Sequence, residues 1–192
     1  MKEPLPLKRP GMKLVEDTAE IIEDVPNGLS ISLVISEKEI NEISTLANEI
    51  WHEHYEAIIG KEQVNYMIDK FQSPEVIKKQ IEEENYKYYR LDSAGDLSGY
   101  FSWRLDNNSL FLSKLYIRKK CRGKNYARKI LEFLEARCRE EKLNKIWLTV
   151  NKDNTNSIAI YENLGFVKMK TQIADIGSGY VMDDYIMEKN IK

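Results

Sequence analysis

Apolar residues recur at helical spacing along the first third of the chain. Over 40–50 they fall three and four positions apart, at Ile40, Ile43, Leu46, Ala47 and Ile50, which is the stripe of an amphipathic helix. Ser36 followed by Glu39 has the form of a capping box, so we expect the helix to begin there. Residues 51–59 then continue the helix or form a tight loop, and Gly60 ends the segment.

Two shorter helices are predicted next, over 62–71 and 74–84. Ser73 is the expected N-cap of the second helix. Pro74 suits its first helical position, because the N–H that proline lacks would be unpaired there anyway.

The pattern then changes to the alternation typical of strands. Strands are expected over 86–91, 97–105 and 110–117, with turn signals between them, and an earlier strand is expected over 30–35. The three consecutive strands predict an antiparallel meander.

The second half of the chain alternates helices and strands. A helix over 125–141 is expected to bury one apolar face, made of Ala127, Ile130, Leu131, Leu134 and Cys138. Residues 146–150 form a short, mostly apolar run, as in a strand that is covered on both faces. A short helix over 156–163 follows, and Gly165 is its expected stop.

A closing hairpin completes the order of elements. Residues 166–174 and 180–188 are expected to pair around a turn at Gly177–Gly179. The full order, β-α-α-β-β-β-α-β-α-β-β with the helical pieces between Glu39 and Glu84 counted as one α-rich stretch, predicts an α/β fold of the α+β kind, with a mixed sheet that is not doubly wound. Residues 29–192 form this domain. Residues 1–28 contain several prolines and an acidic stretch, and we expect a partly disordered extension there.

Composition narrows the function classes. Of 192 residues, 42% are hydrophobic and 31% are charged, as in a soluble globular protein. The net charge of -2 argues against a protein that mainly binds nucleic acid, which needs many uncompensated cationic side chains. No apolar run approaches the roughly 20 residues of a membrane span, and no signal peptide is visible. Cys121 and Cys138 do not make a disulfide framework, so we interpret them as reduced thiols in a cytoplasmic protein.

A basic turn that contains a glycine joins the strand at 110–117 to the next helix. Its cationic side chains are Arg118, Lys119, Lys120, Arg122, Lys124, Arg128 and Lys129. Gly123 lets the backbone approach a ligand closely, and the helix N-terminus adds free N–H groups, so the turn is suited to hold phosphate. Taken alone, the segment is equally compatible with an ordinary solvated charged face. It has neither the P-loop pattern nor the dinucleotide-binding glycine pattern.

A second polar turn, followed by a short helix, lies within 150–166. Asn154 or Thr155 can cap this helix. Ile158 and Tyr161 are three residues apart and share one helix face. Taken singly, Asn154 is most simply a cap and Tyr161 a core aromatic residue.

Together, the two segments resemble the acetyl-CoA signature of the GNAT superfamily of N-acetyltransferases. The first family motif has Arg or Gln, then Gly three positions on, then Gly or Ala two further on. The chain matches it at Arg122 and Ala127, and Asn125 stands at the position of the central glycine. Asparagine is among the residues that best tolerate positive φ, so we expect the turn to keep its shape.

The second family motif has the form N-x-x-A-x-x-x-Y-E-x-x-G-F. The chain matches it at Asn154, Tyr161, Glu162, Gly165 and Phe166, with Ser157 in place of the alanine. The segment 183–189 also resembles the last strand of many members. Both motifs, in this order of elements, make the resemblance specific, and it covers 29–192.

The resemblance implies where acetyl-CoA binds as co-substrate. The strand Leu115, Tyr116 and Ile117 would splay from the strand that begins at Ile146, and the pantetheine arm would pair with backbone groups in that gap. Backbone amides of Arg122, Gly123, Lys124, Asn125, Tyr126 and Ala127 would hold the pyrophosphate. Asn154 would bond the pantetheine or phosphate side, and Tyr161 would lie near the sulfur.

The resemblance also implies direct attack of an amine on the thioester. Tyr161 would protonate the leaving thiolate, and a backbone N–H of the 115–117 strand would hold the oxyanion. The sequence leaves the base open, with Glu53, His52, His54, Tyr116 or a water chain as candidates.

A finer resemblance, to the bacterial group that includes PaiA-type polyamine acetyltransferases, lies in 50–55 and 59–67. It implies a small amine acceptor, for which a polyamine is one candidate, with His52, Glu53 and Tyr55 as candidate substrate-binding residues. Residues two apart on a helix point in roughly opposite directions, so we expect no metal site at the histidines. The ordinary interpretation of each histidine is a half-buried, hydrogen-bonded side chain.

Alternative functions stay open at this point. Acetyl transfer to a protein or peptide amine uses the same chemistry. A noncatalytic CoA-binding regulatory module is suggested by Asn125 and by the unassigned base. Exposed strands expected at the C-terminal end allow a homodimer, and nothing indicates a nucleic-acid or membrane partner.

Overall fold

The computed structural model of this protein describes residues 21–25 and 28–191. Its strands are β1 (Ile21–Val25), β2 (Leu29–Leu33), β3 (Lys87–Ser93), β4 (Asp96–Asp106), β5 (Ser109–Ile117), β6 (Lys145–Asn151), β7 (Val167–Gly177) and β8 (Tyr180–Asn190). Its helices are α1 (Glu37–Ile59), α2 (Lys61–Gln72), α3 (Pro74–Glu82), α4 (Tyr126–Glu140) and α5 (Thr155–Asn163), with a 3₁₀ turn η1 at Lys119–Cys121. The predicted mixed α/β fold is confirmed.

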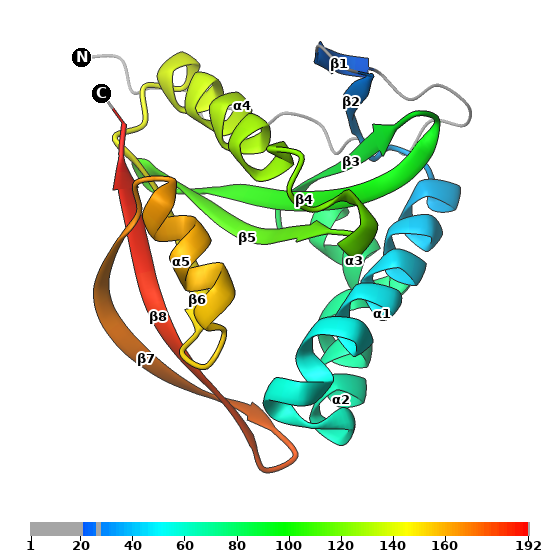
Figure 1. Cartoon of the computed structure of the whole chain (residues 1–192), viewed down its shortest axis with the longest axis vertical. Coiled ribbons are helices and arrows are strands. Elements are labelled where there is room, and N and C mark those ends of the chain that lie inside the picture. Colours follow the sequence, from blue (N-terminus) through cyan, green and yellow to red (C-terminus); the bar gives the residue numbers. More distant parts are fainter. Residues whose placement is uncertain (1–20, 26–27, 192) are drawn as a thin grey trace, which may run out of the picture.

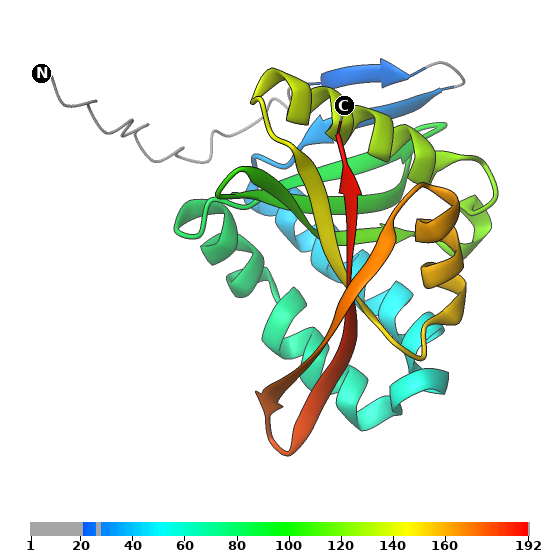
Figure 2. The same ribbon diagram turned by 90° about the vertical axis from the view of Figure 1, so that its left-hand side faces the viewer.

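Within the described residues, the strands form one sheet in the order β1-β2-β3-β4-β5-β6-β8-β7 (Figure 1). Helices α1, α2 and α3 lie against one face, and α4 lies against the other (Figures 1 and 2). One apolar cluster joins α4 to the sheet through residues such as Ile130 and Phe133. A second cluster joins α1–α3 to the opposite face through residues such as Ile43, Tyr88 and Tyr100.

The sheet opens between β5 and β6. These neighbours run parallel and pair only over Ser109–Phe111, opposite Lys145–Trp147. Beyond that point β5 continues to Ile117 and β6 to Asn151 without pairing to each other. The predicted splay of these two strands is therefore confirmed, and it leaves edge N–H and C=O groups of both strands free.

A β-bulge at Ser113 lies where the two strands begin to separate. Ser102 of β4 pairs with Lys114, but the next residue, Trp103, pairs with Leu112, so Ser113 is an extra residue in β5. Such a residue reverses the side-chain alternation of its strand. Leu112 before the bulge and Leu115 after it consequently pack on the same side, in the α4 cluster.

Residues 51–59, for which the sequence allowed a helix or a tight loop, belong to the first helix. Helix α1 runs without interruption to Ile59 and ends at Gly60, which has φ 82° and lies in the region that favours glycine. The capping box is complete, because Ser36 and Glu39 each accept from the other's backbone N–H. Ser73 and Pro74 begin α3 as predicted.

Two expectations differ from the structure. Part of the expected extension, β1, is a strand paired antiparallel with β2, with Val25 opposite Leu29; the rest of that range, where disorder was predicted, lies outside the described residues. Strand β6 is not covered on both faces. Ile146, Leu148 and Val150 are buried, but the alternate residues Trp147 and Thr149 are partly exposed, so only one face of the strand is fully packed.

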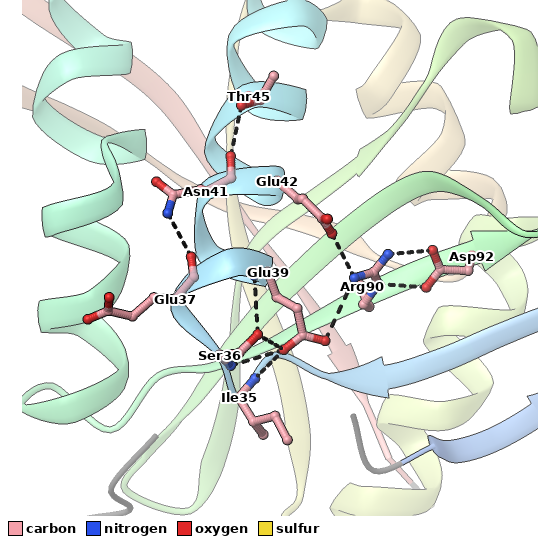
Figure 3. A network of polar contacts seen from close by, with 9 residues as sticks. All are labelled: Ile35, Ser36, Glu37, Glu39, Asn41, Glu42, Thr45, Arg90 and Asp92. Atoms are coloured by element: carbon pink, nitrogen blue, oxygen red, sulfur yellow. Dashed lines mark hydrogen bonds and ion pairs between the residues drawn. The ribbon is translucent and has the colours of Figure 1, made fainter. Parts of the chain in front are cut away.

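Arg90 ties the start of α1 to the sheet (Figure 3). From β3 its guanidinium donates to both carboxylate oxygens of Asp92, at 2.7 and 2.8 Å, and to Glu42 at 2.9 Å. Its Nη1 also lies 3.7 Å from the carboxylate of Glu39, the buried partner in the capping box. Asp92, chiefly through its hydrogen bonds, and Glu42 raise the pKa of Arg90.

Arg90→Met is therefore expected to lower the free energy of unfolding by about 1.5–3 kcal/mol, since the lost hydrogen bonds are charge-assisted and partly buried. Chemical denaturation at pH 7 measures it. Lys78→Met is the matched control, because Lys78 also bridges to the first turn of α1, at Glu37, but in an exposed pair. Exposed pairs contribute about 0–1 kcal/mol. Equal losses in both variants would contradict the tethering role of Arg90.

Candidate active site

A cavity of about 610 Å³ occupies the opening between β5 and β6. Residues of α1 and α2 line one side, and α5 with the first turn of α4 lines the other. The predicted site residues that line it are Tyr55, Leu115, Tyr116, Ile117, Arg122, Ala127, Asn154 and Tyr161. The fold thus brings most of the predicted site together from segments far apart in sequence.

The basic turn lies at one end of this cavity. The N–H groups of 123–128 donate no backbone hydrogen bond within the described part of the chain. Arg122 anchors the turn, because its Nε donates to the carbonyl of Ile117 at 2.9 Å. Gly123 has φ 78° and open space where a Cβ would stand. A row of free donors beside positive charge is suited to an anionic phosphate group.

Asn125 lies in the left-handed region, with φ 64° and ψ 15°. The predicted tolerance of asparagine for positive φ is confirmed, and α4 begins directly after it. Tyr126 contributes only backbone to the turn. Its side chain is buried, and its hydroxyl lies 2.7 Å from that of Ser93.

Replacing Asn125 separates backbone strain from side-chain chemistry. Asn125→Ala is expected to cost about 1–2 kcal/mol of folding free energy, because alanine strains the left-handed conformation, whereas Asn125→Gly removes that strain. Thermal unfolding measures both variants. We also expect acetyl-CoA to bind at least as tightly to Asn125→Gly as to the native protein in calorimetry. Weaker binding would assign the ligand contact to the asparagine side chain.

Helix α1 holds the basic turn through ion pairs. Glu53 lies 3.6 Å from Lys119 and 3.9 Å from Arg122, and Glu49 lies 3.0 Å from Arg118. Glu53 does not line the cavity. Its carboxylate pairs with the cationic turn; its expected place beside an amine acceptor stays a prediction.

His52, the other predicted acceptor-binding residue on this turn of α1, pairs with Glu56, and its role in acceptor binding stays a prediction. Its Nδ1 lies 2.5 Å from a carboxylate oxygen of Glu56, and neither residue lines the cavity. The cause is helical geometry: the face of α1 that carries Trp51, His54 and Tyr55 turns toward the cavity, and each residue is rotated by about 100° from the last.

His54 is fixed by the cap of α5. Asn154 is buried, and its Oδ1 accepts from the N–H of Ser157 at 3.3 Å, which fixes this oxygen as an acceptor. The Nε2 of His54 lies 3.2 Å from the same oxygen and therefore carries the ring proton. Burial lowers the pKa of His54, so its ring is neutral at pH 7.

Aromatic side chains crowd the middle of the cavity. Tyr116 on β5 lies with its ring centroid 5.7 Å from that of Trp51 and 6.5 Å from that of Tyr55. Burial raises the pKa of Tyr161, and the negative charge of ionised Tyr55 would raise it further. Tyr161 consequently keeps its proton at neutral pH and is able to donate it.

Two ionisable residues of the cavity were not among the sequence candidates. Asp184 on β8 is buried, and burial together with the charge of Asp183 raises its pKa to about 6. Lys114 on β5 is buried too, and burial lowers its pKa to about 7. For Lys114 the sequence offers one signal, a lysine inside a mostly apolar strand. For Asp184 it offers none, because this residue reaches the cavity only through the pairing of β8 with β6.

The model of the acetyltransferase (GNAT) domain family matches residues 55–182, well over half of the chain. This protein belongs to the GNAT acetyltransferase family. The enzyme class predicted from the sequence, an N-acetyltransferase, is confirmed with it. Both family motifs lie inside the matched range, at the turn before α4 and on α5.

Individual relatives are distant. An uncharacterised N-acetyltransferase of Lactobacillus delbrueckii subsp. lactis is 21% identical over 163 residues, which cover 81% of this chain and 94% of the relative. The PaiA N-acetyltransferase of Thermoplasma acidophilum, solved in complex with coenzyme A, has a TM-score of 0.69 and 20% identity over 84% of this chain and 98% of its own. A chimera of the spermidine N-acetyltransferase SpeG from Vibrio cholerae has a TM-score of 0.63 and 20% identity over 85% and 95%. At these identities the solved structures support the fold alone.

The GNAT domain offers no metal cluster in its described residues, since no group of three or more His, Cys, Asp or Glu side chains is placed to hold an ion. None of its described helices is long and apolar enough to cross a membrane. Cys121 and Cys138 are both free and buried.

Proposed function

We propose that this GNAT protein transfers the acetyl group of acetyl-CoA to a primary amine of a small molecule. The observation that carries the proposal is the continuity of the cavity. Its lining joins Arg122 and Ala127 of the basic turn, residues 115–117 on the unpaired edge of β5, and Tyr161. This is the order in which a phosphate, a pantetheine arm and a thioester follow one another in acetyl-CoA.

Residues of this chain fit each part of that co-substrate. The pyrophosphate takes the N–H groups of 123–128 and the charge of Arg122. The pantetheine arm takes backbone groups of 115–117, which β6 leaves unpaired. Asn154 contributes indirectly: its Oδ1 caps α5 and holds the ring of His54. The solved PaiA structure with coenzyme A, which shares the fold, supports this reading.

The proposed reaction is one direct displacement. The amine nitrogen attacks the thioester carbonyl carbon, a C–N bond forms and the C–S bond breaks. A backbone N–H of 115–117 holds the oxyanion as it develops. The thiolate takes the proton of the Tyr161 hydroxyl as it leaves.

Asp184 is our candidate for the base. An alkylammonium with a pKa near about 10.4 must lose a proton before it attacks. Asp184 is the only carboxylate that lines the described cavity. A base with a pKa of about 6 is mostly ionised at pH 7, and its negative charge attracts the ammonium. His54, by contrast, is engaged with Asn154 near Arg122.

The finer predictions stay proposals. A polyamine acceptor is suggested by the name of one solved relative, the spermidine N-acetyltransferase SpeG, but a polycation would meet just one carboxylate in the described cavity. A protein amine is disfavoured because Gln63, Tyr66 and Lys70 of α2 hold the β7–β8 hairpin at the rim. The cytoplasmic location and the homodimer stay predictions.

Calorimetric titration with acetyl-CoA, followed by thiol release over a panel of amines, tests the proposal. We expect binding, amine-dependent thiol release and an acetylated product in mass spectrometry. Binding without turnover of any amine would instead support a noncatalytic CoA-binding module. Acetylation confined to proteins of a cell lysate would move the acceptor to the protein class.

A further inference from the structure

Lys114 is a buried lysine that the proposed reaction does not use. It is 5% exposed and lines the cavity from β5. It faces away from the α4 cluster because the bulge at Ser113 reverses the alternation of the strand. No carboxylate lies within ion-pair distance of it among the described residues; the charge of Glu84 acts on it from farther away.

Burial disfavours the ammonium form of Lys114 and lowers its pKa to about 7, but the polar and aromatic contacts of its Nζ favour that form. The Nζ of Lys114 donates to Oε1 of Gln80 at 3.0 Å, and the same oxygen accepts from the hydroxyl of Tyr88 at 2.5 Å. The Nζ also lies 5.6 Å from the ring centroid of Tyr86 and 5.1 Å from that of Tyr88. An amide oxygen and the faces of aromatic rings stabilise a cation.

These contacts leave the cation incompletely paired. An ammonium has three donors, and Gln80 is the one hydrogen-bond partner that the described residues give it. A buried charge without a counter-ion is costly. An anionic group that enters the cavity would offset that cost, whereas a second cation would add to it.

Apolar side chains line much of the cavity, together with the amides of Gln63 and Gln72. Its lining includes Ile59, Met67, Phe71 and Met182. Asp184 supplies the negative charge of the cavity, and Arg122 lies at the end assigned to the pyrophosphate. The acceptor side thus offers one carboxylate, one ammonium and an apolar surface.

We propose that Lys114 binds a carboxylate of the acceptor, so that the acceptor is an amine with an apolar or aromatic body and one carboxylate. The inference rests on the proposed acetyl transfer. A single cation matches one negative charge, which favours a carboxylate over a doubly charged phosphate. A polyamine would bring ammonium groups toward Lys114 and leave it unpaired.

Three amines built on one frame test this inference: 4-(aminomethyl)benzoate, benzylamine and 1,4-bis(aminomethyl)benzene. We expect kcat/KM to be roughly tenfold or more higher for the carboxylate compound than for benzylamine, as for a hydrogen bond to a charged group. The diamine should be the poorest substrate. Lys114→Met should remove the preference for the carboxylate while it leaves benzylamine turnover within a few-fold.

Lys87→Met is the matched control, because it makes the same change at an exposed lysine of β3, and it should keep the native preference. Thermal unfolding of Lys114→Met checks that the variant folds. Calorimetric binding of the three amines to the CoA-loaded protein gives a readout that does not depend on turnover. If no amine is acetylated but the carboxylate compound still binds more tightly than the other two amines, the proposed function is contradicted and the inference about Lys114 is not.

Two outcomes would overturn the inference. A native preference for the diamine, in binding or in turnover, would assign the site to polycations. A loss of benzylamine turnover in a folded Lys114→Met protein would make Lys114 the base of the reaction.

Discussion

Tyr161→Phe is expected to lower kcat by about 10²–10⁴-fold, the usual range for loss of a general acid. The substitution removes only the hydroxyl group. The ring still packs against Phe166, with a centroid distance of 5.6 Å. Because burial holds the pKa of Tyr161 above its usual range, the hydroxyl is protonated when the thiolate leaves. Steady-state thiol release at saturating acetyl-CoA measures the effect.

The pattern of the loss identifies the role of Tyr161. The Kd for acetyl-CoA should stay within a few-fold, since the missing interaction forms only as the C–S bond breaks. Tyr185→Phe is the matched control: Tyr185 is a partly buried tyrosine of β8 that packs on the same apolar cluster without lining the cavity. It should keep native kcat. An unchanged kcat in Tyr161→Phe would remove this tyrosine from the mechanism.

Asp184→Asn is expected to lower kcat/KM by about 10²–10⁴-fold at pH 7, because the amide neither accepts the proton of the ammonium nor attracts its charge. In the native protein the base works only when ionised. The rate should therefore fall as the pH drops through about 6, the raised pKa of Asp184. The variant should lose this acid limb. A pH profile of kcat/KM with benzylamine as acceptor measures both effects.

The neighbouring carboxylate provides a graded control. Asp183 pairs with Lys152, and its negative charge helps to raise the pKa of Asp184, which Lys152 and a hydrogen bond with Thr149 lower. Asp183→Asn should keep the plateau rate and move the acid limb to lower pH, since a nearby negative charge is gone. An acid limb that persists in Asp184→Asn would assign the base to another group.

Local sequence signals predicted the elements well where local physics decides them. Ser36 and Glu39 form the expected capping box, and Gly60 ends α1 with a positive φ. Asn125 adopts the left-handed conformation that its side chain tolerates. In each case the decisive contacts lie within one helical turn of the residue.

Placement of side chains around the cavity was harder to predict. The sequence predicts that the segment 50–55 contributes to the acceptor region, but which of its residues face inward depends on the rotation of α1 against the sheet. His54 and Tyr55 line the cavity, while His52 pairs with Glu56. A rotation of that kind is set by packing between elements distant in sequence.

The sequence by itself determined the order of elements from β2 to β8, the two motif segments and the family to which they point, because capping, periodicity and turn chemistry act between near neighbours. Only the tertiary structure decided which ionisable side chains line the cavity. Lys114 turns inward because of one unpaired residue in β5, and Asp184 arrives through the pairing of β8 with β6. Strand register and bulges depend on partners far along the chain, so the groups assigned here to acceptor recognition and proton transfer became visible in the fold alone.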